Sequence, residues 1–295
     1  MDEGRRIGAM YDRDWDPAGL PAFARAVEAL GVGELWVVED LGWSGGIAAA
    51  TAALAATERL RVGIGICPAP LRNPALLAME LATVAGLFPG RLTAGIGHGV
   101  AAWMAQVGAA PAAPLALLDE TVSAVRALLR GEEVRLKGRA VTLDGVRLVH
   151  PPREVPPVVT GVVRPRSLEL SGRVADGTIV AEGHGPADVR AALAHVARGR
   201  AAAGAQGPYD VTVFTYLCVE RDPARLASVL GPATAGQAEW LGRAPDELYH
   251  AAGPAEEVAA RVRELWEAGA ASAVLRPVGP EPLEQLAKAV KELRP

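Results

Sequence analysis

The chain has 295 residues, of which 50% are hydrophobic and 22% are charged, and its net charge is −4. This length and hydrophobic content allow one barrel-sized domain or two smaller domains with a sizeable core. The small negative charge, without a basic run, excludes nucleic acid and anionic membranes as expected partners. The N-terminus has no apolar signal core, and the sequence has no apolar run of about 18 residues. We therefore expect a soluble, cytoplasmic protein.

The cysteines and histidines indicate neither a disulfide nor a metal site. Cys67 and Cys218 are the only cysteines, and both follow apolar, strand-like runs, so we expect two buried thiols. No Ser-His-Asp order, HExxH, CxxC or P-loop motif occurs. The histidines have no metal-ligand spacing; they are His98, His150, His184, His195 and His250.

The first third of the chain alternates strands with helices. Apolar runs predict strands over 6–10 and 34–39, and helices over 16–30 and 47–57 follow them. Asp16-Pro17 opens the first helix, and Gly31 ends it.

Residues 61–99 form the clearest unit, which reads strand, loop, helix, turn, strand. Glycines alternate with Val62, Ile64 and Ile66, as in a strand buried on both faces. Asn73-Pro74 starts a helix with apolar residues near helical spacing, which predicts one buried face; they include Leu76, Leu77, Met79, Leu81, Val84 and Leu87. A second strand spans 91–96. In a right-handed βαβ unit both glycine-rich tips, 67–73 and 97–99, lie at the carboxyl ends of the strands, where ligands bind in α/β folds.

The rest of the chain continues the alternation. Residues 100–118 are rich in alanine and proline, residues 132–149 predict an excursion with one or two β-hairpins, and residues 222–252 look helical with breaks. We expect strands over 158–161, 176–181, 210–219 and 272–276, and helices over 115–129, 165–173, 186–203, 254–268 and 282–293.

Eight short strands that alternate with helices predict a (β/α)₈ TIM barrel with a hairpin-containing insertion after the fourth strand. The alternative, a doubly wound sheet, needs a glycine fingerprint after the first strand, and Gly8-Ala9-Met10 does not provide it. Because no linker interrupts the pattern, we expect a single domain over 1–295.

Four segments together resemble the luciferase-like flavin/deazaflavin oxidoreductases, and they span nearly the whole chain. They are ELWVVED, GIGICPAPLRNPALLAMELATVAGLFPGRLTAGIGHG, PPVVTGVVRPRSLELSGRVADGTIVAEG and GPAEEVAARVRELWEAGAASAVLRP. The arrangement is most similar to the branch that uses coenzyme F420. The resemblance implies a TIM barrel with the flavin or deazaflavin ring in its mouth.

The resemblance also implies which residues bind the cofactor. It places a non-prolyl cis peptide at Gly65–Ile66, beside the ring, with Cys67 packing nearby and Gly97 and His98 on the next strand. It matches Val162, Val163 and Arg164 to the phosphate-binding loop, where helix N–H groups and the arginine favour an anion. Gly183 and His184 match the loop that touches the cofactor tail, although some F420-dependent members have lysine in place of His184.

Three residues are candidates for proton transfer or for polarising the substrate. His98, between two glycines, matches a position over the ring, and its structural alternative is to cap the next helix. Glu39 and Asp40 end the second strand, where the family often has an acid-histidine pair. Their structural alternative is helix capping and a salt bridge.

The candidate substrate residues are Trp43, Trp103, Tyr11 and Arg276. The tryptophans could wall a pocket or pack under loops. Arg276 could bind an anionic group or pair with an acid. Val100 stands where sugar-phosphate-oxidising relatives have an acid, which argues against that substrate.

The resemblance implies hydride transfer between coenzyme F420 and a small organic substrate, with reduction of an activated C=C, C=N or C=O bond or the reverse. One alternative is an FMN-dependent monooxygenase supplied by a cofactor-reducing enzyme. Another is a barrel that binds its cofactor without catalysis. The family also implies a homodimer, formed through helices on the barrel flank.

Overall fold

The computed structural model describes residues 5–294; the terminal residues 1–4 and 295 of the predicted domain lie outside the described part. Eight parallel strands close a barrel, because β8 pairs with β9 and β11 pairs with β1. In barrel order they are β1 (Arg6–Met10), β2 (Glu34–Val37), β3 (Arg61–Pro68), β4 (Leu92–Gly97), β7 (Val158–Gly161), β8 (Gly177–Val180), β9 (Asp210–Val219) and β11 (Ser272–Pro277). The predicted TIM barrel is confirmed.

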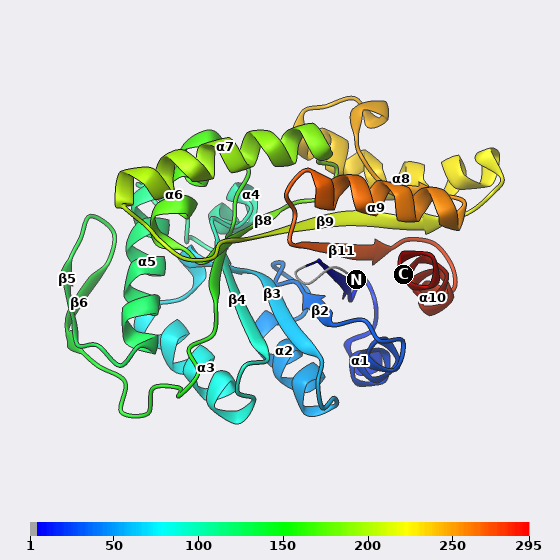
Figure 1. Ribbon diagram of the computed structural model, residues 1–295. Helices are drawn as coiled ribbons and strands as arrows, with labels where there is room; N and C mark the ends of the chain where they lie inside the picture. Colours follow the sequence, from blue (N-terminus) through cyan, green and yellow to red (C-terminus); the bar gives the residue numbers. More distant parts are fainter. Residues whose placement is uncertain (1–4, 295) are drawn as a thin grey trace.

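Helices surround the strands (Figure 1). The α-helices are α1 (Leu20–Ala29), α2 (Gly46–Ala55), α3 (Pro74–Leu87), α4 (Ala101–Gln106), α5 (Pro114–Leu129), α6 (Pro165–Val174), α7 (Pro186–Ala203), α8 (Pro223–Leu241), α9 (Ala255–Glu267) and α10 (Pro282–Leu293). Short 3-10 turns are η1 (Pro17–Gly19), η2 (Ala69–Leu71) and η3 (Pro245–Glu247). Within residues 5–294, no helix combines the length and the apolar character needed to cross a membrane.

The predicted excursion after the fourth strand is a single antiparallel hairpin, β5 (Val134–Lys137) with β6 (Thr142–Val146). It projects from the barrel beside α5 (Figure 1). Glu120 of α5 anchors it, because its carboxylate accepts hydrogen bonds of 2.7–2.8 Å from the N–H groups of Arg139, Ala140 and Val141.

Large side chains fill the barrel interior opposite glycines. Trp36 and Phe214 meet edge to face, with ring centroids 5.3 Å apart. A Cβ atom on Gly63 would lie 2.4 Å from the Trp36 ring, and one on Gly65 would lie 2.7 Å from Phe214. The glycines that alternate along β3 therefore make room for the aromatic rings of β2, its neighbour, and of β9, which is not adjacent to it in the barrel.

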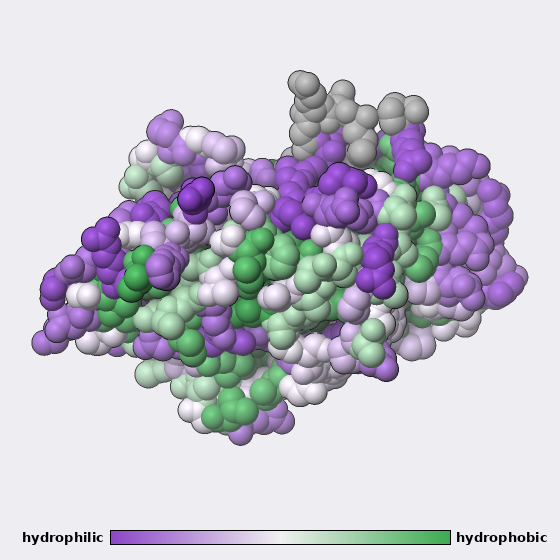
Figure 2. Space-filling model, turned by 90° about the horizontal axis from the view of Figure 1, so that it is seen from below, coloured by the Kyte–Doolittle hydropathy of each residue, from purple (hydrophilic) through white to green (hydrophobic). Residues whose placement is uncertain are grey.

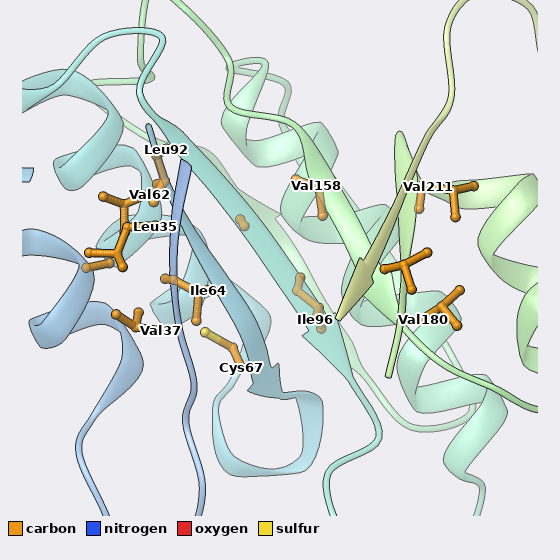
Figure 3. Close-up of a cluster of buried hydrophobic side chains, with 14 of the residues drawn as sticks. Leu35, Val37, Val62, Ile64, Cys67, Leu92, Ile96, Val158, Val180 and Val211 are labelled. Carbon is orange, nitrogen blue, oxygen red and sulfur yellow. The ribbon is translucent and has the colours of Figure 1, made fainter. Parts of the chain in front are cut away.

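A second, larger core lies between the strands and the helices. Its residues alternate with the interior ones along each strand, as expected for strands covered on both faces. Figure 3 shows part of it, with Leu35 and Val37 of β2 beside Val62 and Ile64 of β3. Most of the strands thus bury side chains in both cores, which explains why they are largely apolar in sequence.

Several predicted details are wrong. The helix over 16–30 begins as the 3-10 turn η1, and residues 251–253 form a short strand, β10 (Ala251–Gly253), that pairs with β9. Three residues are too few for a period-2 pattern to appear in sequence. The helix over 74–87 does not bury all of its apolar residues, because Leu76, Met79 and Leu87 are 48%, 55% and 63% exposed. They lie on the side of α3 that faces away from the barrel.

Candidate functional site

The order of strands in the barrel sorts the predicted site residues into two groups. The residues predicted to bind the cofactor lie in the last residues of β3 and β4 or just after β4, β7 and β8. These four strands are consecutive neighbours, and we call their carboxyl ends the cofactor half. Tyr11, Trp43 and Arg276 follow or end β1, β2 and β11, which are also consecutive. We call the carboxyl ends of β9, β11, β1 and β2 the substrate half.

The predicted cis peptide bond between Gly65 and Ile66 is present. The side chain of Ile66 lies across two neighbouring strands. A Cβ atom on Gly161 would come within 2.5 Å of it, and one on Gly97 within 3.0 Å. Ile66 thus forms the floor of the cofactor half, and it fits there because β4 and β7 carry glycines at these positions.

Cys67, the next residue of β3, is buried in the core between the strands and the helices and is 1% exposed. Burial and the nearby Glu39 carboxylate raise the pKa of its thiol. The thiol therefore stays protonated, which fits the packing role expected for it.

His98 follows β4 and is half-buried. Its Nε2 atom lies 3.0 Å from Oγ of Ser167 in the first turn of α6. Burial lowers the pKa of His98, and the nearby Arg164 charge lowers it further. The imidazole is therefore neutral at pH 7. The side chain makes no cap on α4, so the alternative expected from the sequence is wrong.

The loop from β7 to α6 has the features of an anion site. Val162 is buried, Val163 is half-buried and Arg164 is exposed at the N-cap of α6. No side chain caps the first turn of this helix, so its N–H groups remain available to an anion, and the helix dipole favours one there. This donor set fits the phosphate of a nucleotide-like cofactor.

The next helix differs at its N-terminus. Asp188 of α7 accepts a hydrogen bond of 2.9 Å from the N–H of Gly185 and pairs with Arg243. His184 is buried, with Nδ1 2.9 Å from the carbonyl oxygen of Ala181, and Gly183 has a positive φ of 86°. An acid already occupies this helix end, so α6 is the better of the two anion sites.

Glu39 is held on both carboxylate oxygens. One accepts a hydrogen bond of 2.8 Å from the N–H of Gly46 at the start of α2, and Arg72 contacts both oxygens as an ion pair. The same arginine lies 3.1 Å from Glu80. These contacts favour the capping and ion-pairing interpretation of Glu39 over the chemical one.

Asp40 belongs to a cluster with an arginine and two tryptophans. Nη1 of Arg13 lies 2.5 Å from Oδ2 of Asp40, and the guanidinium lies 4.5 Å from the Trp43 ring centroid. The Trp43 and Trp103 rings are 5.9 Å apart, and Nε1 of Trp43 donates a hydrogen bond of 2.8 Å to Asp14. The predicted tryptophan pair is thus brought together at the mouth.

Arg276 pairs with acids on both sides. Its Nε atom lies 2.8 Å from Oδ2 of Asp12, and its Nη1 atom lies 3.0 Å from Oε1 of Glu182. The guanidinium also lies 5.2 Å from the Tyr216 ring centroid. Of the two interpretations open from the sequence, the structure supports ion pairing.

Tyr11 lies in an aromatic cluster under the first loop. Its ring meets Trp15 and Phe23 edge to face, and its hydroxyl donates a hydrogen bond of 2.5 Å to the carbonyl oxygen of Asp16. These contacts give Tyr11 a packing role rather than contact with substrate.

Sequence reasoning missed Asp12, Arg13, Ser167 and Glu182. Asp12 and Glu182 each stand two residues beyond a predicted or observed strand, and that position was the available signal. Ser167 had no signal, because only the packing of α6 against β4 brings it to His98.

Known proteins that resemble this chain identify its family. The profile of the luciferase-like monooxygenase family matches residues 5–290. The 5,10-methylenetetrahydromethanopterin reductase of Archaeoglobus fulgidus is 23% identical, over 98% of this chain and 99% of that protein. The enzyme of that name from Methanolobus tindarius is 27% identical over 70% of this chain and 63% of its own length, less than two thirds. The F420-dependent glucose-6-phosphate dehydrogenase of Nakamurella multipartita is 29% identical over 58% of this chain and 54% of that protein.

Two solved structures share the fold. An F420-dependent secondary alcohol dehydrogenase in complex with an F420-acetone adduct has a TM-score of 0.87 and 21% identity, covering 99% of both chains. A type II Baeyer-Villiger monooxygenase from Pseudomonas putida in complex with FMN has a TM-score of 0.75 and 16% identity, covering 98% of both. Because the family profile matches nearly the whole chain, this chain belongs to the luciferase-like monooxygenase family.

Proposed function

We propose that this chain is a coenzyme F420-dependent oxidoreductase that transfers a hydride between F420 and a small organic substrate. The observation that carries the proposal is the run of four neighbouring strand ends, β3, β4, β7 and β8, with an uncapped helix N-terminus and Arg164 among them. Relatives named as F420-dependent or as methylenetetrahydromethanopterin reductases support F420 as the cofactor.

Each element of this arrangement has a separate task. Bound F420 supplies or accepts the hydride. Ile66 shields one face of the mouth, and the first turn of α6 with Arg164 holds the cofactor's phosphate. The neutral imidazole of His98 donates a hydrogen bond that polarises the double bond of the substrate, or accepts a proton in the reverse direction, with Ser167 fixing its ring. Asp40 contributes through Arg13, which it holds over Trp43.

The first test is a titration of the purified chain with F420 and, separately, with FMN, following the fluorescence of each ligand. Tight binding of F420 with weak binding of FMN supports the proposal. Turnover is then measured without oxygen on enones, imines and alcohols. A chain that does not bind F420 would falsify the proposal.

A flavin-dependent monooxygenase is the second candidate, because the family contains such enzymes and an FMN complex shares the fold. That function requires reduced flavin from a partner enzyme. Oxygen consumption by the chain with reduced FMN and a substrate would favour it. A deazaflavin does not readily activate oxygen, so the two candidates give opposite results in this assay.

The protein also forms a homodimer in this proposal, through α2 and α3. The exposed residues of these neighbouring helices carry no charge; they are Ala48, Ala52, Ala55, Leu76, Met79, Thr83, Gly86 and Leu87. Figure 2 shows this side of the molecule, on which hydrophobic side chains reach the surface in several places. Apolar surface of this kind gains free energy when a partner removes it from water. A second copy is the partner we choose because two-fold homodimers are the commonest assembly.

A further inference from the structure

The charges in the substrate half are distributed unequally. The loops that follow β1 and β2 carry Asp12, Asp14, Asp16, Glu39 and Asp40 against one arginine, Arg13. That arginine is already paired with Asp40. Glu39 is paired with Arg72, and a further guanidinium of this half, that of Arg276, lies at the end of β11.

Two carboxylates, those of Asp12 and Glu182, pair with the Arg276 guanidinium. The side chains of Arg276, Asp12 and Glu182 are 16%, 11% and 10% exposed, so water screens their interaction little. Burial alone would lower the pKa of Arg276, but Glu182, Tyr216 and Asp12 together raise it. The cluster therefore keeps a fixed positive charge between two negative ones and has a net charge of −1.

Tyr216 adds no charge to this balance. It is 4% exposed, and burial raises its pKa to about 12, so its hydroxyl stays protonated near neutral pH. An anionic group that approached Arg276 would meet an excess of one carboxylate and a guanidinium whose Nε and Nη1 atoms already donate to carboxylate oxygen atoms. Repulsion and competition would both oppose its binding.

The aromatic pair beside this cluster has the opposite preference. Trp43 is 44% exposed and already carries the Arg13 guanidinium over its ring. Aromatic faces attract cations and stack on planar uncharged groups. Asp14 accepts a hydrogen bond from the N–H of this ring, and Asp40 pairs with the Arg13 guanidinium that lies over it.

We propose that the substrate half, together with Glu182 at the adjoining end of β8, accepts neutral or positively charged organic substrates and rejects phosphorylated or carboxylated ones, with Asp12 and Glu182 as the residues that determine this specificity. The inference rests on the proposed function, which makes the bound molecule a substrate. The preference for the charge of that molecule can be measured without cofactor. It separates this chain from relatives that are named for glucose 6-phosphate.

The test is calorimetric titration of the cofactor-free chain with glucose 6-phosphate, in the wild type and in the double variant Asp12→Asn/Glu182→Gln. The double variant should bind at least about tenfold more tightly, because Arg276 then faces no carboxylate. The double variant Glu58→Gln/Glu267→Gln is the matched control, since it removes two exposed acids at the other end of the barrel. It should bind as the wild type does.

Melting curves establish that each variant is folded. If the main double variant does not fold, Glu182→Gln alone keeps the Asp12 pair and should give a smaller gain. If the substitutions do not strengthen the binding of glucose 6-phosphate relative to the wild type, the inference is overturned. Arg164 is present in the wild type and in every variant, so binding at the predicted phosphate loop contributes equally to each protein that is compared. F420 titration is read separately, so failure of cofactor binding and failure of charge selection are distinguishable.

Discussion

Nε2 of His98 lies 3.0 Å from Oγ of Ser167, and this contact joins the end of β4 to the first turn of α6. It connects the candidate acid-base residue to the helix that we propose binds the cofactor's phosphate. Correct placement of the cofactor and correct orientation of the imidazole therefore depend on the same helix.

His98→Gln is expected to lower kcat by about 10²-fold or more, because the proton or polarising contact is lost. The Kd for F420 should change little, since the phosphate site lies on α6. Anaerobic assays that follow the absorbance of F420 measure kcat, and ligand fluorescence measures Kd. Ser167→Ala serves as the comparison and should lower kcat less, because the imidazole remains. Unchanged kcat in His98→Gln would remove His98 from the mechanism.

Arg164→Gln is expected to weaken F420 binding by about tenfold or more, because a charge-assisted contact with the phosphate is lost. A deazaflavin that lacks the phosphate-bearing tail should bind the variant and the wild type equally. Fluorescence titration measures both ligands. An equal loss for both would place Arg164 at the ring rather than at the phosphate.

Gly95→Ala is expected to destabilise the fold by about 1–3 kcal/mol or more. Its Cβ atom would lie 2.1 Å from the carbonyl oxygen of Ile64, which is backbone of the adjacent strand and has little freedom to move. Gly33→Ala is the control, since no atom lies within 4 Å of the added carbon. Urea denaturation compares the two free energies of unfolding. Equal stability of the two variants would contradict this packing argument.

Stability should fall as the pH drops below about 6.5, partly because of His250. Its Nδ1 atom is buried without a hydrogen-bond partner, and burial with the nearby Arg261 charge lowers the pKa from 6.5 to about 4. The unfolded chain then binds a proton that the folded chain does not. The contribution of His250 to stability is fully present above pH 6.5 and is lost progressively as the pH falls toward 4.

The measurement is the Tm at pH 7.5 and pH 5.0 for the wild type and for His250→Asn. The variant should lose less Tm between the two values. His98, whose pKa is also lowered, contributes with the same sign in both proteins. An identical loss of Tm in both would show that His250 does not take part.

Met79→Glu is expected to shift the protein toward the monomer, because it places a charge within the uncharged surface of α2 and α3. Val149→Glu is the control, since Val149 is 85% exposed and belongs to neither helix. Light scattering after size-exclusion chromatography measures the mass. A monomeric wild type, or a dimer that Met79→Glu leaves intact, would contradict the proposed interface.

The sequence by itself determined the barrel. Strands such as 61–68 alternate small and branched apolar residues, helices begin at Asn73-Pro74 and Asp16-Pro17, and these signals depend only on neighbouring residues. The resemblance to a known family located the strand ends that gather at the mouth, including the cis bond at Gly65–Ile66. Local patterns also implied one buried face on α3, which is present, but they wrongly put Leu76, Met79 and Leu87 on it, because periodicity does not reveal what covers each side of a helix.

Only the tertiary structure decided which charges meet. Arg276 was open to two interpretations, and its pairing with Asp12 and Glu182 joins residues that are 264 and 94 positions apart. The contact of His98 with Ser167, and that of Glu39 with Arg72, depend in the same way on the packing of separate βα units. A sequence fixes the type of each side chain and its local conformation, whereas burial and the nearest opposite charge, which set its chemistry, are properties of the closed barrel.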